Sequence, residues 1–529
     1  MPDSPAAHDL AGREINADAA HEAKFVLAKC WLQECITSHS ACRSPSQPLL
    51  PTRLIEVEPF QRSSDVRLVL PSPGMRGHYA ALSYCWGAGN QVILTKSNID
   101  DRRARIESAS LPKTIQDALV ITRNIGLKYL WVDALCILQD SATDWETESA
   151  RMGHVYNLAL VTIQAAVAGD CREGCLNKYT ASDLPPAQLR YVSNAGEVGK
   201  VYVRQSPLVT SLSTEPLHDR GWTLQEALLS PRILSFGSTQ MSWECSTCYR
   251  SEGGSSLANS GHSSGLPKPV RRSIKDSSTP AGLPLDDVAT QRALAWANIV
   301  REYSWRNLTF PSDKLPALSG LARYLSNTRP GDVYLAGLWR SEMPGNLFWA
   351  ASGSAKKPTT RPTQYRAPSW SWASVNGPVS AVSCTLGPCT VHCEIVAASV
   401  THIGLDTFGE VQAGKLTVYS QMKEVWRIFD ETNASADGDV QFFYPEARAL
   451  LLSDRPFFLK LGICALDILD SSQKLHEPVS TWMLRITELD GLALRARVDG
   501  TFERVGHYSL DDDKAGWFED CERREVHIV

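Results

Sequence analysis

The feature that most constrains the fold is an alternation of short apolar runs with stretches of helical apolar spacing. The apolar runs lie at 79–86, 129–132, 160–163 and 232–236, and the helical stretches lie at 111–126, 144–157 and 220–230. Short apolar runs separated by amphipathic helices are typical of buried parallel strands joined by right-handed crossovers. The alternation therefore predicts an α/β core with a parallel sheet.

The carboxyl ends of the first two predicted strands carry residue types that suit a ligand site. The first run leads into a loop that contains Trp86, Gly87 and Gly89. The second run closes in Asp133, and Gln139 follows shortly after it. Ligands of α/β proteins gather at the carboxyl ends of parallel strands, and glycines let backbone amides approach a phosphate. A tight turn also explains the glycines, and a solvated strand end or a helix N-cap also explains the aspartate.

The helical stretch at 220–230 carries one carboxylate among apolar neighbours. Thr223 and Glu226 have the spacing of a capping box, and Pro231 limits continuation of the helix. A carboxylate in apolar surroundings can have a raised pKa or stabilise a cationic transition state, and Arg220 is a candidate charge partner. The same carboxylate can instead cap the helix N-terminus, so two roles remain open for Glu226.

Charge and composition exclude two classes of partner. The 529-residue chain has a formal net charge of −5 and a pI of about 6.2, so it lacks a basic field for nucleic acid or anionic membrane. The first 25 residues contain no apolar run of a signal peptide, and the most apolar stretch, 158–168, is too short to span a bilayer. Fourteen cysteines in so long a chain are typical of reduced thiols. We expect a soluble, cytoplasmic protein that binds neither nucleic acid nor membrane.

A helical stretch at 23–36 runs into a group of potential metal ligands. These are Cys30, Cys35, His39 and Cys42, and a Cys-x2-Cys pair, Cys245 and Cys248, lies much later. Thiolates and imidazole at this spacing can bind zinc, but structural zinc sites usually combine two such knuckles, and each group here stands alone in the sequence. The sequence therefore favours a packed helix end with buried thiols and no metal.

Composition divides the chain into five expected parts. They are an N-terminal helical, cysteine-containing lead-in (1–60), an α/β domain (61–250), a flexible Ser/Gly/Pro-rich loop (251–290), a helical, Trp-rich region (291–380) and a β-rich C-terminal domain (381–529). Residues 170–217 depart from the α/β alternation and predict an insertion with a hairpin at 191–203. In the Trp-rich region, Trp370 and Trp372 suit either a ligand pocket or core packing.

Four stretches together resemble the fungal heterokaryon-incompatibility (HET) domain. They are YAALSYCWG at 79–87, the segment 111–140, the segment 151–165, and RGWTLQEALLSPRILSF at 220–236. Segments at 313–320, 337–339 and 367–374 are similar to those that commonly follow this domain, so the resemblance covers most of the chain.

The HET domain is in turn similar to the TIR domain, which has a flavodoxin-like fold. The resemblance implies a TIR/flavodoxin-like parallel-sheet core with insertions, followed by a helical and antiparallel β C-terminal region. It implies that Glu226 is the glutamate that enzymatic TIR domains need for NAD cleavage. The residues that would surround the nucleotide are Ser83, Trp86, Gly87, Gly89, Asp133, Gln139, Arg220 and Trp222.

Three functions are compatible with these residues. The first is an NAD glycohydrolase of fungal non-self recognition and programmed cell death, with NAD as substrate and no firm cofactor; self-assembly would trigger it. The second is a non-enzymatic cell-death module that binds partners through an exposed Trp-rich face; a HET-type enzyme of secondary metabolism is the third. Because the chain lacks a Walker motif, a nucleotide-binding receptor would be a separate protein. A cysteine hydrolase using Cys85 or Cys136 with His154 or His218 is disfavoured, since buried thiols are usually inert.

Overall fold

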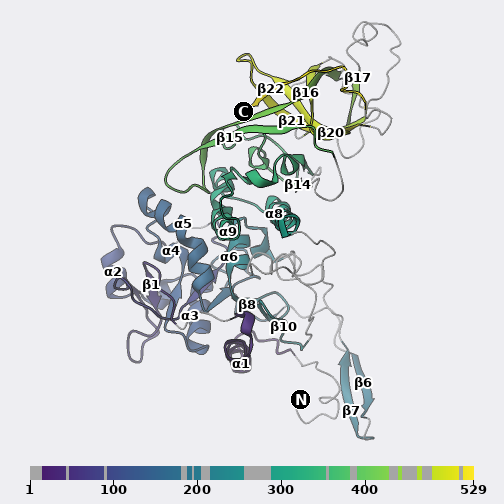
Figure 1. The fold of residues 1–529 in the computed structure, drawn as a ribbon. Helices are drawn as coiled ribbons and strands as arrows, with labels where there is room; N and C mark the ends of the chain where they lie inside the picture. The colour runs from purple at the N-terminus through teal and green to yellow at the C-terminus, as the bar shows by residue number, and fades with distance from the viewer. Residues whose placement is uncertain are drawn as a thin grey trace. The chain divides into compact units, whose positions relative to one another are not determined.

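The structure is a computed structural model of the chain, and it divides into two compact units, Met1–Asp276 and Ser277–Val529 (Figure 1). It describes residues 15–42, 47–88, 92–179, 187–193, 196–203, 215–254, 288–352, 357–381, 390–427, 439–443, 462–466, 479–510 and 516–529. Gly89 and most of the predicted flexible loop at 251–290 lie outside these residues. Among the described residues, no helix has the length and apolarity needed to cross a membrane.

An eight-stranded mixed sheet organises the N-terminal unit. Its order is β10-β9-β8-β5-β3-β4-β1-β2, and the central strands β8, β5, β3 and β4 run parallel. The strands are β1 (Leu54–Glu56), β2 (Arg67–Val69), β3 (Ala80–Ser83), β4 (Tyr129–Trp131), β5 (Val161–Gln164), β8 (Arg232–Phe236), β9 (Met241–Cys245) and β10 (Tyr249–Ser251). Every residue of β3 and β5 is buried, as expected for strands that are covered on both faces. The predicted α/β core with a parallel sheet is therefore confirmed.

Helices precede and connect these strands, and the apolar spacing predicts all of them except the two short ones at 99–104 and 133–136. The helices are α1 (Glu22–Ser38), α2 (Ile99–Ala104), α3 (Lys113–Asn124), α4 (Asp133–Cys136), α5 (Ala142–Leu158) and α6 (Trp222–Leu229). Helix α3 ends just before Gly126, whose φ of +83° suits the left-handed residue that follows many helices. The predicted hairpin consists of β6 (Ala187–Val192) and β7 (Val198–Val203), which pair antiparallel.

The connections define where a ligand site belongs in this sheet. The chain passes from β3 to its neighbour β4, then crosses to β5 on the other side of β3, and continues outward to β8. The strand order thus reverses between β3 and β5. At that point Ser83 and Gln164 are register partners, each at the carboxyl end of its strand. Crevices at such reversals are the usual ligand sites of open α/β sheets.

In its described residues, the C-terminal unit combines two α-helices, short β pairs and a large, mostly antiparallel sheet. The helices are α8 (Val288–Ser304) and α9 (Pro316–Ser326), and the short strands are β11 (Tyr334–Leu335), β12 (Leu338–Trp339), β13 (Trp349–Ala351) and β14 (Val379–Ala381). The sheet contains β15 (Glu394–His402), β16 (Val411–Arg427), β17 (Asp439–Phe443), β18 (Gly462–Leu466), β19 (Val479–Arg485), β20 (Asp490–Ala496), β21 (Phe502–Leu510) and β22 (Arg523–Ile528). Strand β16 pairs with both β17 and β19, so the β16-β17-β18-β21-β20-β19 path closes into a barrel.

Four tryptophans of the predicted Trp-rich region are core residues. Trp339, Trp349, Trp370 and Trp372 are at most 1% exposed. The Trp349 indole N–H donates to the Trp370 carbonyl at 2.9 Å, and the Trp372 indole N–H donates to the Gly337 carbonyl at 2.9 Å. The expectation that these four tryptophans form an exposed face is therefore wrong, because their rings are buried in the core of the unit.

Candidate active site

Helix α6 places Glu226 inside the N-terminal unit. Seven of its eight residues are buried, and Glu226 itself is 5% exposed. The capping-box prediction is wrong, because the helix begins earlier than the spacing suggested: its N-cap is Gly221, which has no side chain to cap with. The Thr223 hydroxyl instead donates to the carbonyls of Leu217 and Arg220, each at 2.8 Å. Glu226 therefore does not cap the helix N-terminus, which was the structural alternative to a catalytic role.

Burial changes the acidity of this carboxyl group. Removal from water, with a smaller contribution from nearby Asp133, raises the pKa of Glu226 from 4.5 to about 7, against the opposing effects of Ser83, Arg220 and Tyr156. The Tyr156 hydroxyl already donates its proton to the Leu82 carbonyl at 3.0 Å. Ser83 is therefore the hydroxyl that remains available to donate to the carboxylate. At neutral pH a substantial fraction of Glu226 is ionised.

Four buried polar atoms around this point have no hydrogen-bond partner in the described part of the chain. They are Glu226 Oε2, Ser83 Oγ, Tyr84 OH and Gln164 Nε2. Leaving such an atom unsatisfied costs about 1–3 kcal/mol each, so a group of them indicates a place where a ligand or water completes the hydrogen bonding. Two of them, on Ser83 and Gln164, lie where the strand order reverses.

Asp133 supplies a second carboxylate at the same edge of the sheet. It is the first residue of α4, directly after β4, and it is partly buried. The Trp86 indole N–H donates to its Oδ2 at 2.8 Å, and the Ala134 amide donates to its Oδ1 at 2.7 Å. Burial raises the pKa of Asp133, and the charge of Arg220 opposes that rise. Trp86 and Asp133 therefore form one bonded pair beside Glu226, and the solvated-strand-end interpretation of Asp133 is wrong.

Arg220 links the loop after β3 to the helix that carries Glu226. Its Nη1 donates to the Tyr84 carbonyl at 2.6 Å. Its positive charge opposes the rise in the pKa of both Glu226 and Asp133, which places it close to the two carboxyl groups. Arg220 therefore acts on Glu226 through its charge, and the proposed charge partnership stays a prediction.

Three other predicted residues have different surroundings. A Cβ on Gly87, whose φ is +77°, would lie 2.0 Å from Asp170 Oδ2, so a carboxylate of the protein fills the space expected for a phosphate. Gln139 donates to the backbone carbonyls of Asp133 and Ile137, both at 3.2 Å, and so shapes the loop. Trp222 begins α6 and is partly exposed.

Comparison with known families identifies the segment that contains this site. Residues 79–226 match the family model of the heterokaryon incompatibility protein (HET). We refer to this matched stretch as the HET segment. Comparison with curated proteins and with solved structures gives no match.

The HET segment contains all the predicted site residues and three that sequence reasoning missed. The missed residues are Tyr84, Tyr156 and Gln164. Gln164 had a usable signal, because it is a polar residue at the end of an apolar strand run. Tyr156 had none, because it falls on the apolar stripe of α5 and only its hydroxyl reaches the site.

The HET segment contains no activated thiol among the candidates. Burial raises the pKa of Cys85 to about 11 and the pKa of Cys136 to about 12. Both groups are therefore protonated at neutral pH and are poor nucleophiles. The raised pKa values of these thiols therefore argue against a cysteine hydrolase.

Proposed function

We propose that the HET segment hydrolyses the nicotinamide–ribose bond of NAD, with Glu226 as the catalytic carboxylate. The observation that carries the proposal is the buried Glu226 carboxyl with its unpartnered Oε2. This atom lies near the unpartnered Ser83 hydroxyl of β3, where the strand order of the sheet reverses. A group that is costly to bury and contributes no structural hydrogen bond through that atom is a candidate for chemistry.

The chemistry needs one carboxylate. As the bond between the ribose carbon and the nicotinamide nitrogen breaks, its electron pair leaves with neutral nicotinamide, and the ribose becomes an oxocarbenium-like cation. The ionised Glu226 stabilises this cation, and water then adds to the sugar carbon and releases a proton, giving ADP-ribose. Nicotinamide leaves without needing a general acid.

Neighbouring residues prepare this carboxylate. The Ser83 hydroxyl is placed to orient it, while Asp133 and Arg220 act on its charge in opposite directions. The indole of Trp86, held by Asp133, offers a flat face for a base or nicotinamide ring. These roles follow from the contacts within the protein, and each is a part of the proposal.

The arrangement of the sheet supports the TIR-like part of the proposal. The four parallel strands lie in the spatial order β4-β3-β5-β8. When these four are renumbered by their order in the chain, the strand order is 2-1-3-4, which is also how the strand order of a flavodoxin-like sheet begins. In the cell, we propose that this activity serves non-self recognition and programmed cell death. Self-assembly or a separate nucleotide-binding receptor would trigger it.

Nicotinamide release from NAD tests the proposal. We expect the purified full-length protein to release nicotinamide at high protein concentration, and Glu226→Gln to lower the rate at least about 100-fold, as for loss of an essential electrostatic group. Glu244→Gln, which changes another buried carboxyl of the same unit on β9, should retain the rate.

Melting temperatures of both variants separate a chemical loss from misfolding. Release that persists in Glu226→Gln would contradict the assigned role of Glu226. Absence of release from wild-type protein at every concentration, with no shift of the melting temperature by NAD, would refute the NAD proposal.

A further inference from the structure

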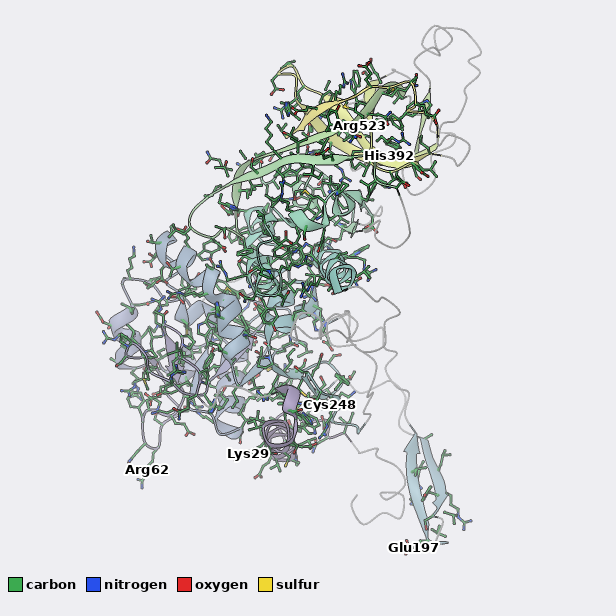
Figure 2. The ribbon with its side chains drawn as sticks, in the orientation of Figure 1. Lys29, Arg62, Glu197, Cys248, His392 and Arg523 are labelled. Atoms are coloured by element: carbon green, nitrogen blue, oxygen red, sulfur yellow. The ribbon has the colours of Figure 1, made fainter. Side chains whose placement is uncertain are left out.

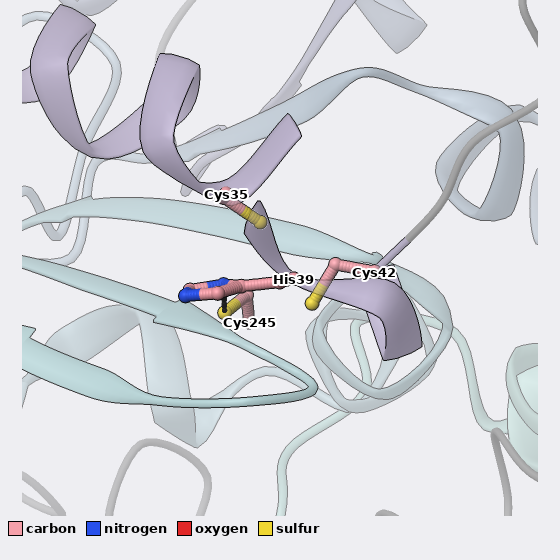
Figure 3. Close-up of side chains that lie close together, drawn as sticks. All are labelled: Cys35, His39, Cys42 and Cys245. Carbon is pink, nitrogen blue, oxygen red and sulfur yellow. Dashed lines mark hydrogen bonds between the residues drawn. The ribbon is translucent and has the colours of Figure 1, made fainter. Parts of the chain in front are cut away.

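A second cluster of reactive side chains lies apart from Glu226. Cys35, His39, Cys42 and Cys245 each direct one ligand atom to a common point, and these four atoms lie within 4.8 Å of one another (Figure 3). Cys245 Sγ and His39 Nδ1 are 3.5 Å apart. We propose that these four residues form a structural Zn²⁺ site that fastens helix α1 to strand β9.

The chain builds three of the ligands into one compact turn. Cys35 lies in the last turn of α1, His39 is the residue that ends the helix, and Cys42 closes the short 3-10 helix that follows. The His39 amide donates to the Cys35 carbonyl at 3.3 Å, and the Cys42 amide donates to the His39 carbonyl at 3.1 Å. Two successive tight turns thus bring the three side chains to the same side. Cys245, the last residue of β9, supplies the fourth.

The distances suit tetrahedral zinc. With Zn–S bonds of about 2.3 Å and Zn–N bonds of about 2.0–2.1 Å, the ligand atoms of a tetrahedral site stand about 3.5–3.8 Å apart. The pair of Cys245 and His39 is already at this separation. A small contraction of the remaining side chains closes the coordination shell. Four protein ligands leave no open position for substrate, so the site is structural.

The surroundings of the cluster suit a metal with thiolate ligands. Three thiolates and one Zn²⁺ give a net charge of −1, and the buried Arg232 balances it: its Nε donates to Cys35 Sγ at 3.1 Å, and its guanidinium also contacts the Cys42 carbonyl. The Thr247 hydroxyl lies 3.4 Å from Cys42 Sγ. Donors of this kind around the sulfurs commonly orient metal ligands.

A fifth thiol next to the cluster provides a matched control. Cys248 Sγ is 3.7 Å from Cys245 Sγ but is not among the four converging ligands. Its backbone amide lies 3.4 Å from Cys245 Sγ, to which it donates. In Figure 2, Cys248 lies beside α1, the helix that carries Lys29. The Cys248→Ser variant therefore changes an adjacent thiol without removing a ligand.

Metal content is the first test. We expect about one zinc ion per full-length chain by elemental analysis, loss of that ion in Cys245→Ser and in His39→Ala, and retention in Cys248→Ser. Co²⁺ in place of zinc should give the visible bands of tetrahedral coordination and the near-ultraviolet charge transfer of thiolate ligands. Wild-type protein that binds neither ion, or a Cys245→Ser variant that keeps its zinc, would overturn the proposal.

Removing zinc from the wild-type protein with a chelator tests the site without any substitution, so it remains informative if a ligand variant fails to fold. Removal of zinc should lower the melting temperature and make the cluster thiols react with a thiol reagent, and added zinc should reverse both changes. Protein whose zinc is removed without any change in stability or thiol reactivity would contradict a structural role. The test does not involve NAD, so its result is independent of the proposed hydrolase activity.

Discussion

At the scale of single residues, Glu226 has surroundings unlike those of an ordinary surface carboxylate. It is buried, its Oε2 has no partner in the described chain, and burial raises its pKa to about 7. A buried carboxyl with a raised pKa destabilises the folded protein whenever it is ionised. The same property that suits it for chemistry therefore has a measurable cost in stability.

This cost predicts how stability depends on pH. The folded-state pKa of Glu226 lies above its ordinary value of 4.5. The contribution of Glu226 to folding stability is therefore most favourable below pH 4.5, and it is lost as the pH rises through about 7. Glu226→Gln removes this dependence, so we expect the variant to gain stability relative to wild type across that range, by up to about 3 kcal/mol. Urea unfolding of both proteins at a series of pH values measures this difference in stability. A difference between the two proteins that does not change with pH would contradict a raised pKa.

At the scale of secondary-structure elements, the sequence predicts more of the fold than of the site. Apolar periodicity depends on local spacing, so the parallel strands and helices α3, α5 and α6 could be found without a structure. The start of α6 could not, because Gly221 already has helical dihedral angles and moves the helix start upstream of Thr223. The proximity of Cys245 to Cys35, His39 and Cys42 also could not be predicted from the sequence, because it joins segments at opposite ends of the unit's sequence.

The role of Thr223 gives a prediction for this element. Its hydroxyl donates to two carbonyls that precede α6, so Thr223→Val should lower the free energy of unfolding by about 1–2 kcal/mol and reduce nicotinamide release by displacing Arg220. Thr147→Val on α5 is the control, because that exposed hydroxyl donates to the Thr143 carbonyl at 2.9 Å. Equal effects of the two substitutions in denaturant unfolding would show that the buried hydroxyl has no special role.

At the scale of the whole molecule, the chain consists of two compact units with separate cores. We therefore expect two transitions in calorimetry of the full-length protein. Thr223→Val should lower one of them, and Tyr303→Phe should lower the other, because the Tyr303 hydroxyl is buried and donates to the Lys314 carbonyl at 2.9 Å. A single two-state transition that both substitutions shift would indicate one cooperative unit instead.

The proposed zinc ligands have a notable position relative to the HET segment. Cys35, His39 and Cys42 precede residue 79, and Cys245 follows residue 226, so the four ligands bracket the whole segment. A link between points so far apart reduces the number of conformations open to the unfolded chain, and most of that loss falls on the enclosed segment. The zinc available in the cell would then determine what fraction of this protein is folded.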